Sequence, residues 1–294
     1  MWGTLIEGVG GVDAIASLDH PERPLVGMPL STRLQAFIDP SGSVVYFDGV
    51  VFRKFVPVPF SYATPWQYPA NPTANSPVIG TCPTSIFCDG GFQMQQDTGA
   101  LIARTSAGWV DLQGRMLVTT SGSVLAWNSA GYFLVYNLDG LDAYGISVRD
   151  PQGRDFPVTA FGPHAFASLF PHARAHGSDF WIVFQTSTTE RSLWTIAANG
   201  TATKTGDYAP YDKPISQRFD AALAADGSFW NVLTRQNPVG SPHYVDDYIV
   251  RLPLVPGTPT VVYDEGTFPV PPPSGANNAP PRAWYHSSFL FTSP

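Results

Sequence analysis

The chain has few charged side chains and very little lysine. Asp, Glu, Lys and Arg make up 13% of its 294 residues, about half the share that is usual in soluble proteins. Lysine occurs only at positions 54, 204 and 213, basic residues form no run, and the net charge is −7. A nucleic-acid partner is therefore not expected, because affinity for a phosphate backbone depends on clustered Lys and Arg.

Long apolar runs and standard catalytic motifs are also missing. No stretch approaches the roughly 20 apolar residues that cross a membrane, so we expect no membrane insertion. The sequence lacks the G-x-S-x-G, H-E-x-x-H, Walker and dinucleotide-binding glycine motifs, and we expect no cofactor and no metal. Residues 1–7 lack the basic start and apolar run of a signal peptide, so either a leader was removed or export does not use that route.

Cysteine is rare as well, with only Cys82 and Cys88 present. Their closeness in the sequence predicts a small disulfide loop, which would suit an oxidising compartment or an exposed particle. Two reduced thiols are the alternative. A zinc site is not expected, because the chain has no second cysteine pair.

What the chain does contain is a turn of small residues followed by an aliphatic or aromatic run, roughly once every 50 residues. The copies are Ser41–Val45, Asp89–Phe92, Ser121–Leu125, His176–Phe180, Asp226–Phe229 and a degenerate His286–Leu290. The chain is also rich in turn-forming residues, with 27 Gly and 29 Pro. A repeat of this period, with several short strands in each unit, is typical of β-propeller blades.

On these Gly-Ser turns and this four-strand rhythm, the chain resembles β-propeller repeat proteins in general, over most of its length. It has neither the Gly-His and Trp-Asp pairs of WD repeats nor the double glycine of kelch repeats. The resemblance implies an all-β fold, a single β-propeller domain over 1–294, with six blades of four-stranded antiparallel sheet. Five or seven blades are the alternatives.

Both ends of the chain carry strand signals without neighbouring partners, which predicts that the termini close the ring in one composite blade. Asp13–Leu18 is compatible with a strand or with a helical turn. The expected blade repeats lie near 33–62, 84–112, 115–149, 170–206 and 218–264, with the composite blade formed from 1–18 and 282–292.

The histidines allow two interpretations. In an extended segment His172, Arg174 and His176 share one face, opposite Ala173 and Ala175, which favours structural polar residues between blades with Asp220 as the partner of Arg174. The alternative is a metal or catalytic cluster that includes His164.

Aromatic residues in or beside loops are the candidate binding residues, because amphipathic rings stack on sugars and anchor protein interfaces. They are Trp66, Tyr68, Tyr208, Tyr211 and Tyr244. Three Pro-rich segments, Pro57–Pro83, Gln236–Asp247 and Phe268–Pro281, are expected to be irregular. They would either cover a blade edge or present a recognition loop.

Fold alone does not determine function, since propellers serve as binding rings, scaffolds and enzymes. The favoured hypothesis is a non-enzymatic structural or adhesive propeller that binds a protein or glycan through rim loops, in an extracellular or virion setting such as a phage tail. The first alternative is a carbohydrate-active hydrolase or lyase with its site at the axial opening, which would need two carboxylates in one cleft. The second is an exported bacterial scaffold.

Overall fold

The computed structural model is all-β in the part of the chain that it describes, and its strands form four-stranded antiparallel sheets. This confirms the expected fold class at that level. The described residues are 2–7, 12–17, 24–29, 35–41, 43–47, 51–54, 77–81, 91–95, 98–120, 122–138, 144–161, 172–185, 190–211, 221–236, 245–264 and 285–290. Within them, no helix has the length and apolarity that crossing a membrane requires.

Five of the sheets are each built from four strands that follow one another along the chain. The first two are β4 (Gln35–Ile38), β5 (Val44–Phe47), β6 (Val51–Lys54) and β7 (Val78–Thr81), then β8 (Phe92–Met94), β9 (Leu101–Arg104), β10 (Trp109–Asp111) and β11 (Met116–Val118). The third is β12 (Ser123–Trp127), β13 (Phe133–Leu138), β14 (Tyr144–Arg149) and β15 (Asp155–Pro157). The last two are β16 (His172–His176), β17 (Asp179–Gln185), β18 (Arg191–Ile196) and β19 (Ala202–Asp207), then β20 (Ala221–Leu223), β21 (Phe229–Gln236), β22 (Val245–Leu252) and β23 (Thr260–Asp264).

A further sheet joins the two ends of the chain, in the order β24-β1-β2-β3. Its strands are β24 (Tyr285–Leu290), β1 (Trp2–Glu7), β2 (Val12–Ser17) and β3 (Pro24–Pro29). β24 runs antiparallel to β1, with Trp2 opposite Leu290. Asp13–Leu18 is therefore mainly a strand rather than a helical turn, since β2 pairs on both sides.

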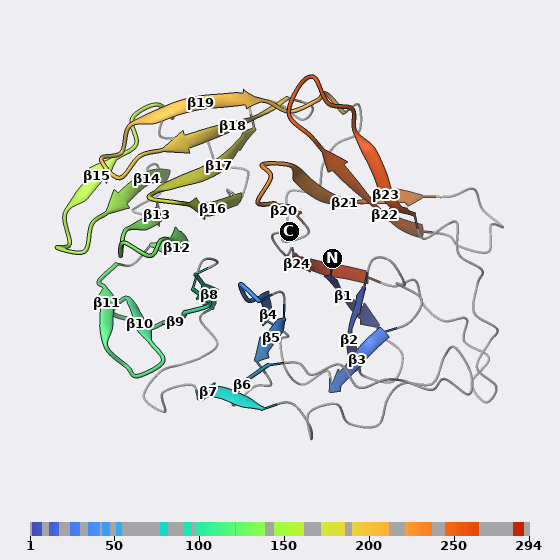
Figure 1. Ribbon diagram of the computed structural model, residues 1–294, viewed down its shortest axis with the longest axis horizontal. Helices are drawn as coiled ribbons and strands as arrows, with labels where there is room; N and C mark the ends of the chain where they lie inside the picture. The colour runs from blue at the N-terminus through green and yellow to red at the C-terminus, as the bar shows by residue number, and fades with distance from the viewer. Residues whose placement is uncertain are drawn as a thin grey trace.

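The sheets are arranged around a common centre in a propeller-like fold (Figure 1). The first strand of each of the five consecutive sheets, together with β24, lies nearest the centre. These inner strands contact one another in the order β8, β12, β16, β20, β24 and β4. The fourth strand of each sheet lies at the circumference.

The hydrophobic core lies between the faces of neighbouring sheets. Four clusters of buried side chains each join two consecutive sheets, from β4–β7 onward to β20–β23. Phe52 and Phe92, for example, meet edge to face across the first of these junctions, with ring centroids 4.7 Å apart. Because a sheet between two others is buried on both faces, β17 reads Asp-Phe-Trp-Ile-Val-Phe-Gln rather than as an alternating pattern.

Five hairpins in the described part of the chain share one five-residue turn. The N–H of the first residue donates to the carbonyl of the fifth, and a glycine at the fourth position donates back to the first. The turns are 111–115, 128–132, 150–154, 197–201 and 224–228, and their glycines have φ between 80° and 82°. Glycine is favoured there because other residues reach this left-handed conformation only with strain.

The repeat found in the sequence mixes two structural positions. Ser41–Val45, His176–Phe180 and Asp226–Phe229 contain the turn between the first and second strands of their sheets. Ser121–Leu125 instead runs into the first strand β12, and His286–Leu290 lies inside β24. The equivalent turns of the two sheets β8–β11 and β12–β15 are at 95–100 and 128–132. The irregular spacing of the repeat follows from this mixture.

Several strand limits differ from those expected. Pro57–Pro83 was expected to be irregular, but its end forms β7, the outer strand of its sheet. β3 begins and ends with proline and was not expected. β3 is an edge strand, where a residue that cannot donate a ladder hydrogen bond is tolerated. β7 is also an edge strand, and its four residues include no proline. Met116–Val118 belongs to the second of the consecutive sheets rather than to the third.

Candidate functional site

The histidine-containing segment forms β16, an inner strand paired with β17. The ring of His172 lies 5.3 Å from the ring of Phe229 in the next sheet, and burial lowers the pKa of His172 to about 4. The ring of His176 is exposed and stacks on Trp181 at 3.7 Å. The two histidines therefore have separate surroundings and no shared ligand position. No group of three His, Cys, Asp or Glu side chains in the described residues could hold a metal ion.

A small hollow lies beside the centre of the fold, between three inner strands. It is lined by Gln93, Met94, Leu125, Ala126, Trp127, Ala173, Arg174 and Ala175, and its volume is about 30 Å³. β8, β12 and β16 contribute these residues, and Asn128 links two of the adjoining turns by donating to the carbonyl of Ser178 at 2.8 Å. Such a volume admits a group of two or three heavy atoms, not a sugar ring.

Two of the residues that line this hollow, Gln93 and Arg174, have polar side chains, and both are half-buried. Arg174 stands opposite Trp181 on β17 and also interacts with other groups of the chain. Its expected partner, Asp220, lies outside the described residues. Trp127 forms part of the wall and is held by stacking on Phe133, at 5.7 Å and an interplanar angle of 4°.

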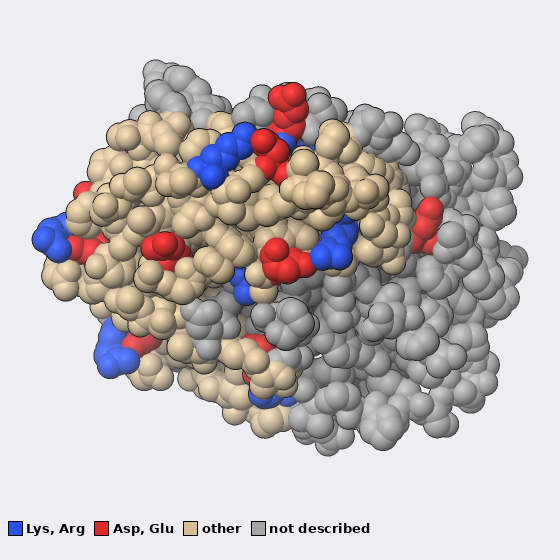
Figure 2. Space-filling model, turned by 45° about the horizontal axis from the view of Figure 1, so that its top comes forward, with Lys and Arg blue, Asp and Glu red and all other residues tan. Residues whose placement is uncertain are grey.

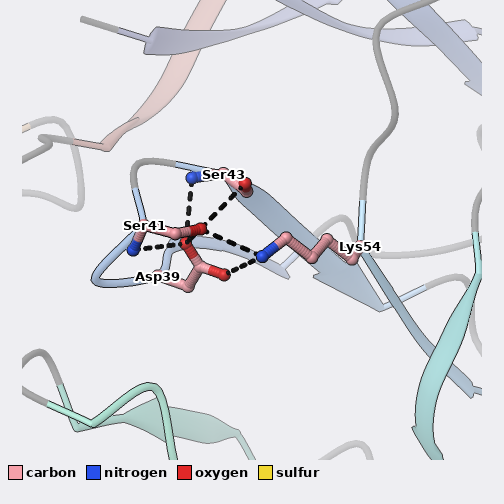
Figure 3. A network of polar contacts seen from close by, with 4 residues as sticks. All are labelled: Asp39, Ser41, Ser43 and Lys54. Atoms are coloured by element: carbon pink, nitrogen blue, oxygen red, sulfur yellow. Dashed lines mark hydrogen bonds and ion pairs between the residues drawn. The ribbon is translucent and has the colours of Figure 1, made fainter.

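A second polar cluster surrounds the turn between β4 and β5 (Figure 3). Asp39 accepts hydrogen bonds at Oδ1 from the N–H groups of Ser41 and Ser43, each at 2.9 Å. Lys54 Nζ donates to Asp39 Oδ2 at 2.7 Å and to Ser41 Oγ at 3.0 Å. Burial alone would raise the pKa of Asp39. Hydrogen bonds from Lys54, Ser41 and Ser43 outweigh this effect and lower the pKa of Asp39 to about 2.

This cluster stabilises the β4–β5 turn and joins it to β6, and it does not activate Ser41 as a nucleophile. Ser41 Oγ donates to Asp39 Oδ1 at 2.6 Å, so its proton goes to a carboxylate that is already ion-paired. Asp111 and Asp150 play the same part in their turns, and each accepts from two backbone N–H groups and from an arginine Nε four residues later. The recurrence in three sheets indicates a turn-stabilising device.

The aromatic residues expected to bind a ligand have different surroundings. Tyr208 is 4% exposed, belongs to the core between the sheets of β19 and β20, and donates from its hydroxyl to the carbonyl of Gly227 at 2.9 Å. Tyr211 is half-buried against the same cluster. Trp66, Tyr68 and Tyr244 lie outside the described residues, as do Cys82 and Cys88, so the binding role of these rings and the disulfide stay predictions.

Neither charge is concentrated on the described part of the face in Figure 2. In Figure 2, Lys and Arg lie beside Asp and Glu over the described part of the face. The pairs are local: Arg251 contacts Asp226 at 2.6 Å, and Arg149 pairs with Asp155. The hollow and the Asp-centred turns were both missed from the sequence. The turns had a detectable signal, Asp-x-Gln-Gly-Arg at 111–115 and 150–154.

Comparisons with known proteins give weak structural similarity alone. The chain matches no protein-family model and no curated protein sequence. It is similar to a puromycin hydrolase mutant complexed with PGG, at 15% identity and a TM-score of 0.42, over 80% of this chain and 40% of that one. It is similar to TolB from Acinetobacter baumannii at 12% identity and a TM-score of 0.36, over 88% of this chain and 52% of that one. The chain therefore spans about half, or less, of the length of these proteins.

Proposed function

We propose that the chain is a six-bladed β-propeller closed by both termini. Support comes from the pairing of β24 with β1 and from the contacts of the inner strands around the centre. A ring of this kind places every sheet between two others, so each buries both faces. Blade faces are then unavailable to partners, and binding falls to the loops and to the circumference.

We further propose that this propeller is a non-enzymatic module that binds a protein partner at its circumference and the adjoining loops. One observation carries this proposal. The large aliphatic side chains exposed in the described part of the chain all lie on outer strands or on the turn before one. They are Val78 and Ile79 on β7, Met116 on β11, Val255 before β23, and Val261 and Val262 on β23.

Aliphatic side chains at an exposed edge fit a protein better than a glycan. They form no hydrogen bonds with sugar hydroxyls. Their burial against another apolar surface removes them from water, which is favourable. The low charge content of the chain is also typical of the central part of protein interfaces. A glycan partner would depend on rings such as Trp66, Tyr68 and Tyr244.

The hydrolase alternative gains no support from the hollow beside the centre. Glycoside hydrolysis uses two carboxylic acids roughly 5–10 Å apart in one cleft. The residues that line this hollow include no acid. The extracellular or virion setting and the phage-tail assignment remain part of the proposal, and they rest on sequence features alone.

The test compares Val261→Asp with Thr260→Asp, an exposed position on the same strand. Wild type and variants are immobilised, a partner is purified from the native source, and its affinity is measured. We expect Val261→Asp to weaken binding by roughly tenfold or more, and Thr260→Asp to leave it unchanged, with equal melting temperatures. Release of sugar products from a polysaccharide panel would favour the hydrolase. If every outer-strand variant bound the partner as tightly as wild type, the circumference would not be the binding surface.

A further inference from the structure

Two turns of neighbouring sheets present the same exposed tripeptide, Gln-Gly-Arg. The turn 111–115 joins β10 to β11, and the turn 150–154 joins β14 to β15, so each connects the third strand of its sheet to the fourth. Residues 113–115 and 152–154 are all exposed. β11 and β15 are both outer strands at the left of Figure 1, and a shared core cluster joins their sheets. Because equivalent turns of neighbouring sheets in a ring lie at the same end, both tripeptides belong to one surface.

The arginine of each turn is held at one nitrogen only. Arg115 Nε donates to Asp111 Oδ2 at 2.5 Å, and Arg154 Nε donates to Asp150 Oδ2 at 2.6 Å. The two arginine side chains are 77% and 70% exposed. In the described part of the chain, no hydrogen bond or ion pair ends on the Nη atoms of either residue. Each guanidinium is therefore oriented by its aspartate and keeps its outer N–H groups for another molecule.

The turn itself does not require the arginine. At 128–132 the same turn forms with Asn128 in the first position and Tyr132 in the fifth. Asn128 Oδ1 accepts from the N–H groups of Ala130 and Tyr132, at 3.1 and 3.0 Å, just as the aspartates accept in their turns. An uncharged pair thus satisfies the same backbone. The Asp-Arg pairs add an exposed cation to the turn, and turn formation does not account for it.

The charge that a partner meets at these turns is positive. Asp111 and Asp150 are buried, and each shares its negative charge with two backbone N–H groups as well as with its arginine. The guanidinium groups stand outside them. The net charge of −7 on the chain has little effect at this contact, since salt at physiological strength screens exposed charges beyond about 8 Å.

One of the turns adjoins the exposed aliphatic residues at the circumference. Met116, 46% exposed, directly follows Arg115. Arginine and methionine are both enriched in protein interfaces. A guanidinium fork matches the two oxygens of a carboxylate, and such charge-assisted bonds also fix the orientation of a partner.

We propose that the turns 111–115 and 150–154 form a docking surface for an acidic segment of a protein partner. Carboxylates of that segment accept hydrogen bonds from the Nη groups of Arg115 and Arg154, and Met116 packs against its apolar atoms. This inference rests on the proposed function, because it names the chemistry of the partner that the propeller binds.

The experiment measures fluorescence anisotropy of a fluorescein-labelled peptide of alternating Glu and Gly, titrated with the full chain at low ionic strength. We expect saturable binding that weakens as salt is added. A matched peptide of alternating Gln and Gly should not bind, because it has the same length without the carboxylates. An oligothymidylate tests a phosphate backbone as the source of the acidic groups, and we expect it to bind more weakly than the Glu peptide.

Arginine variants locate the binding. Arg115→Gln and Arg154→Gln should each weaken binding of the Glu peptide by roughly two- to fivefold, the range for an exposed ion pair, and the double variant should show roughly the product. Arg251→Gln is the control, because it removes the same charge at a position where Nη2 is already bonded to Asp226 at 2.6 Å. Its affinity should equal that of wild type.

Arg115→Lys guards against a loss of folding. It keeps a cation for the buried Asp111 but has no fork, so it should melt like wild type and bind the Glu peptide as weakly as Arg115→Gln. Absence of saturable binding, equal binding of the Gln peptide, tighter binding of the oligothymidylate, or wild-type affinity in the double variant would each overturn the inference. The circumference proposal fails separately: if Val261→Asp has no effect on the native partner while Arg115→Gln and Arg154→Gln weaken its binding, the acidic docking surface stands and the contact at β23 does not.

Discussion

The hydroxyl of Tyr208 donates a hydrogen bond of 2.9 Å to the carbonyl oxygen of Gly227, and this bond joins the end of one sheet to the first turn of the next. The backbone beside it makes the same connection. Tyr208 pairs with Leu254, the N–H of Ala209 donates to the carbonyl of Pro253, and the N–H of Val255 donates to that of Asp207. These two neighbouring sheets are thus joined by backbone and side-chain hydrogen bonds as well as by apolar packing.

Tyr208→Phe should therefore destabilise the protein by about 1–2 kcal/mol, because a buried carbonyl loses its side-chain donor while the ring is retained. Burial raises the pKa of Tyr208 above its ordinary value, with the charge of Asp226 adding to the effect, so the donor stays protonated through neutral pH. Urea unfolding of the variant measures the loss. Tyr132→Phe, at a half-buried position in a hairpin turn, is the control and should unfold like wild type.

The hairpin glycines allow backbone strain to be separated from steric contact. Gly114 and Gly200 both have φ of +81°, but a Cβ on Gly114 meets nothing within 4 Å, whereas one on Gly200 would lie 2.9 Å from the carbonyl oxygen of Phe156. Gly114→Ala should cost about 1–2 kcal/mol, the strain of the left-handed conformation alone. Gly200→Ala should cost clearly more. Equal losses in thermal unfolding would show that the second contact relaxes freely.

His172 should make the protein sensitive to mild acid. Its pKa in the folded chain is about 4, below the ordinary 6.5, because burial disfavours the charged ring. The unfolded chain therefore binds the proton more readily, and stability falls as the pH drops from about 6.5 to about 4, by at most about 3 kcal/mol. Urea midpoints measured across this range should fall less in His172→Phe than in wild type. Parallel curves for the two proteins would contradict the assignment.

The Asp39 cluster should act in a more acidic range. Its pKa of about 2 lies below the ordinary 3.8, because hydrogen bonds from Lys54, Ser41 and Ser43 exceed the effect of burial. The stabilisation is present above about pH 4 and is lost as the pH falls toward 2. Asp39→Asn should therefore be less stable than wild type at pH 6, and the two urea midpoints should converge near pH 2. A constant difference between them would assign the effect to the turn geometry instead of the charge.

Most strands could be predicted from the sequence. Which residues occupy equivalent positions in different sheets could not. Asn-Gly between two extended runs is a strong hairpin signal, and β18 and β19 do flank Asn199-Gly200. The motif Ser121–Leu125 looked like the same turn as Asp226–Phe229, although one precedes an inner strand and the other follows one. A Gly-Ser pair reports local backbone conformation, and its place within a sheet depends on pairings that short motifs do not encode.

The candidate site was less accessible than the fold. Residues 172–176 were correctly treated as extended, but nothing local indicates that Ala173 and Arg174 lie beside Gln93 from a strand about 80 residues earlier. Tyr208 illustrates the opposite difficulty. It follows a strand and resembles a loop residue in the sequence, yet the next sheet buries it. Both features arise from packing between sheets, which depends on contacts that are distant in the sequence.

Closure by the termini gives a direct test of the propeller proposal. Deleting Tyr285–Pro294 removes β24, the strand that pairs with β1 and contacts β20 and β4. If the ring depends on it, the truncated chain should lose a large share of the roughly 5–15 kcal/mol that stabilises a typical domain, and should melt at a much lower temperature. Deleting only residues 292–294 leaves β24 intact and is the control. If the longer truncation melts at the same temperature as the shorter one, β24 does not close the ring, and the six-bladed arrangement loses its main support.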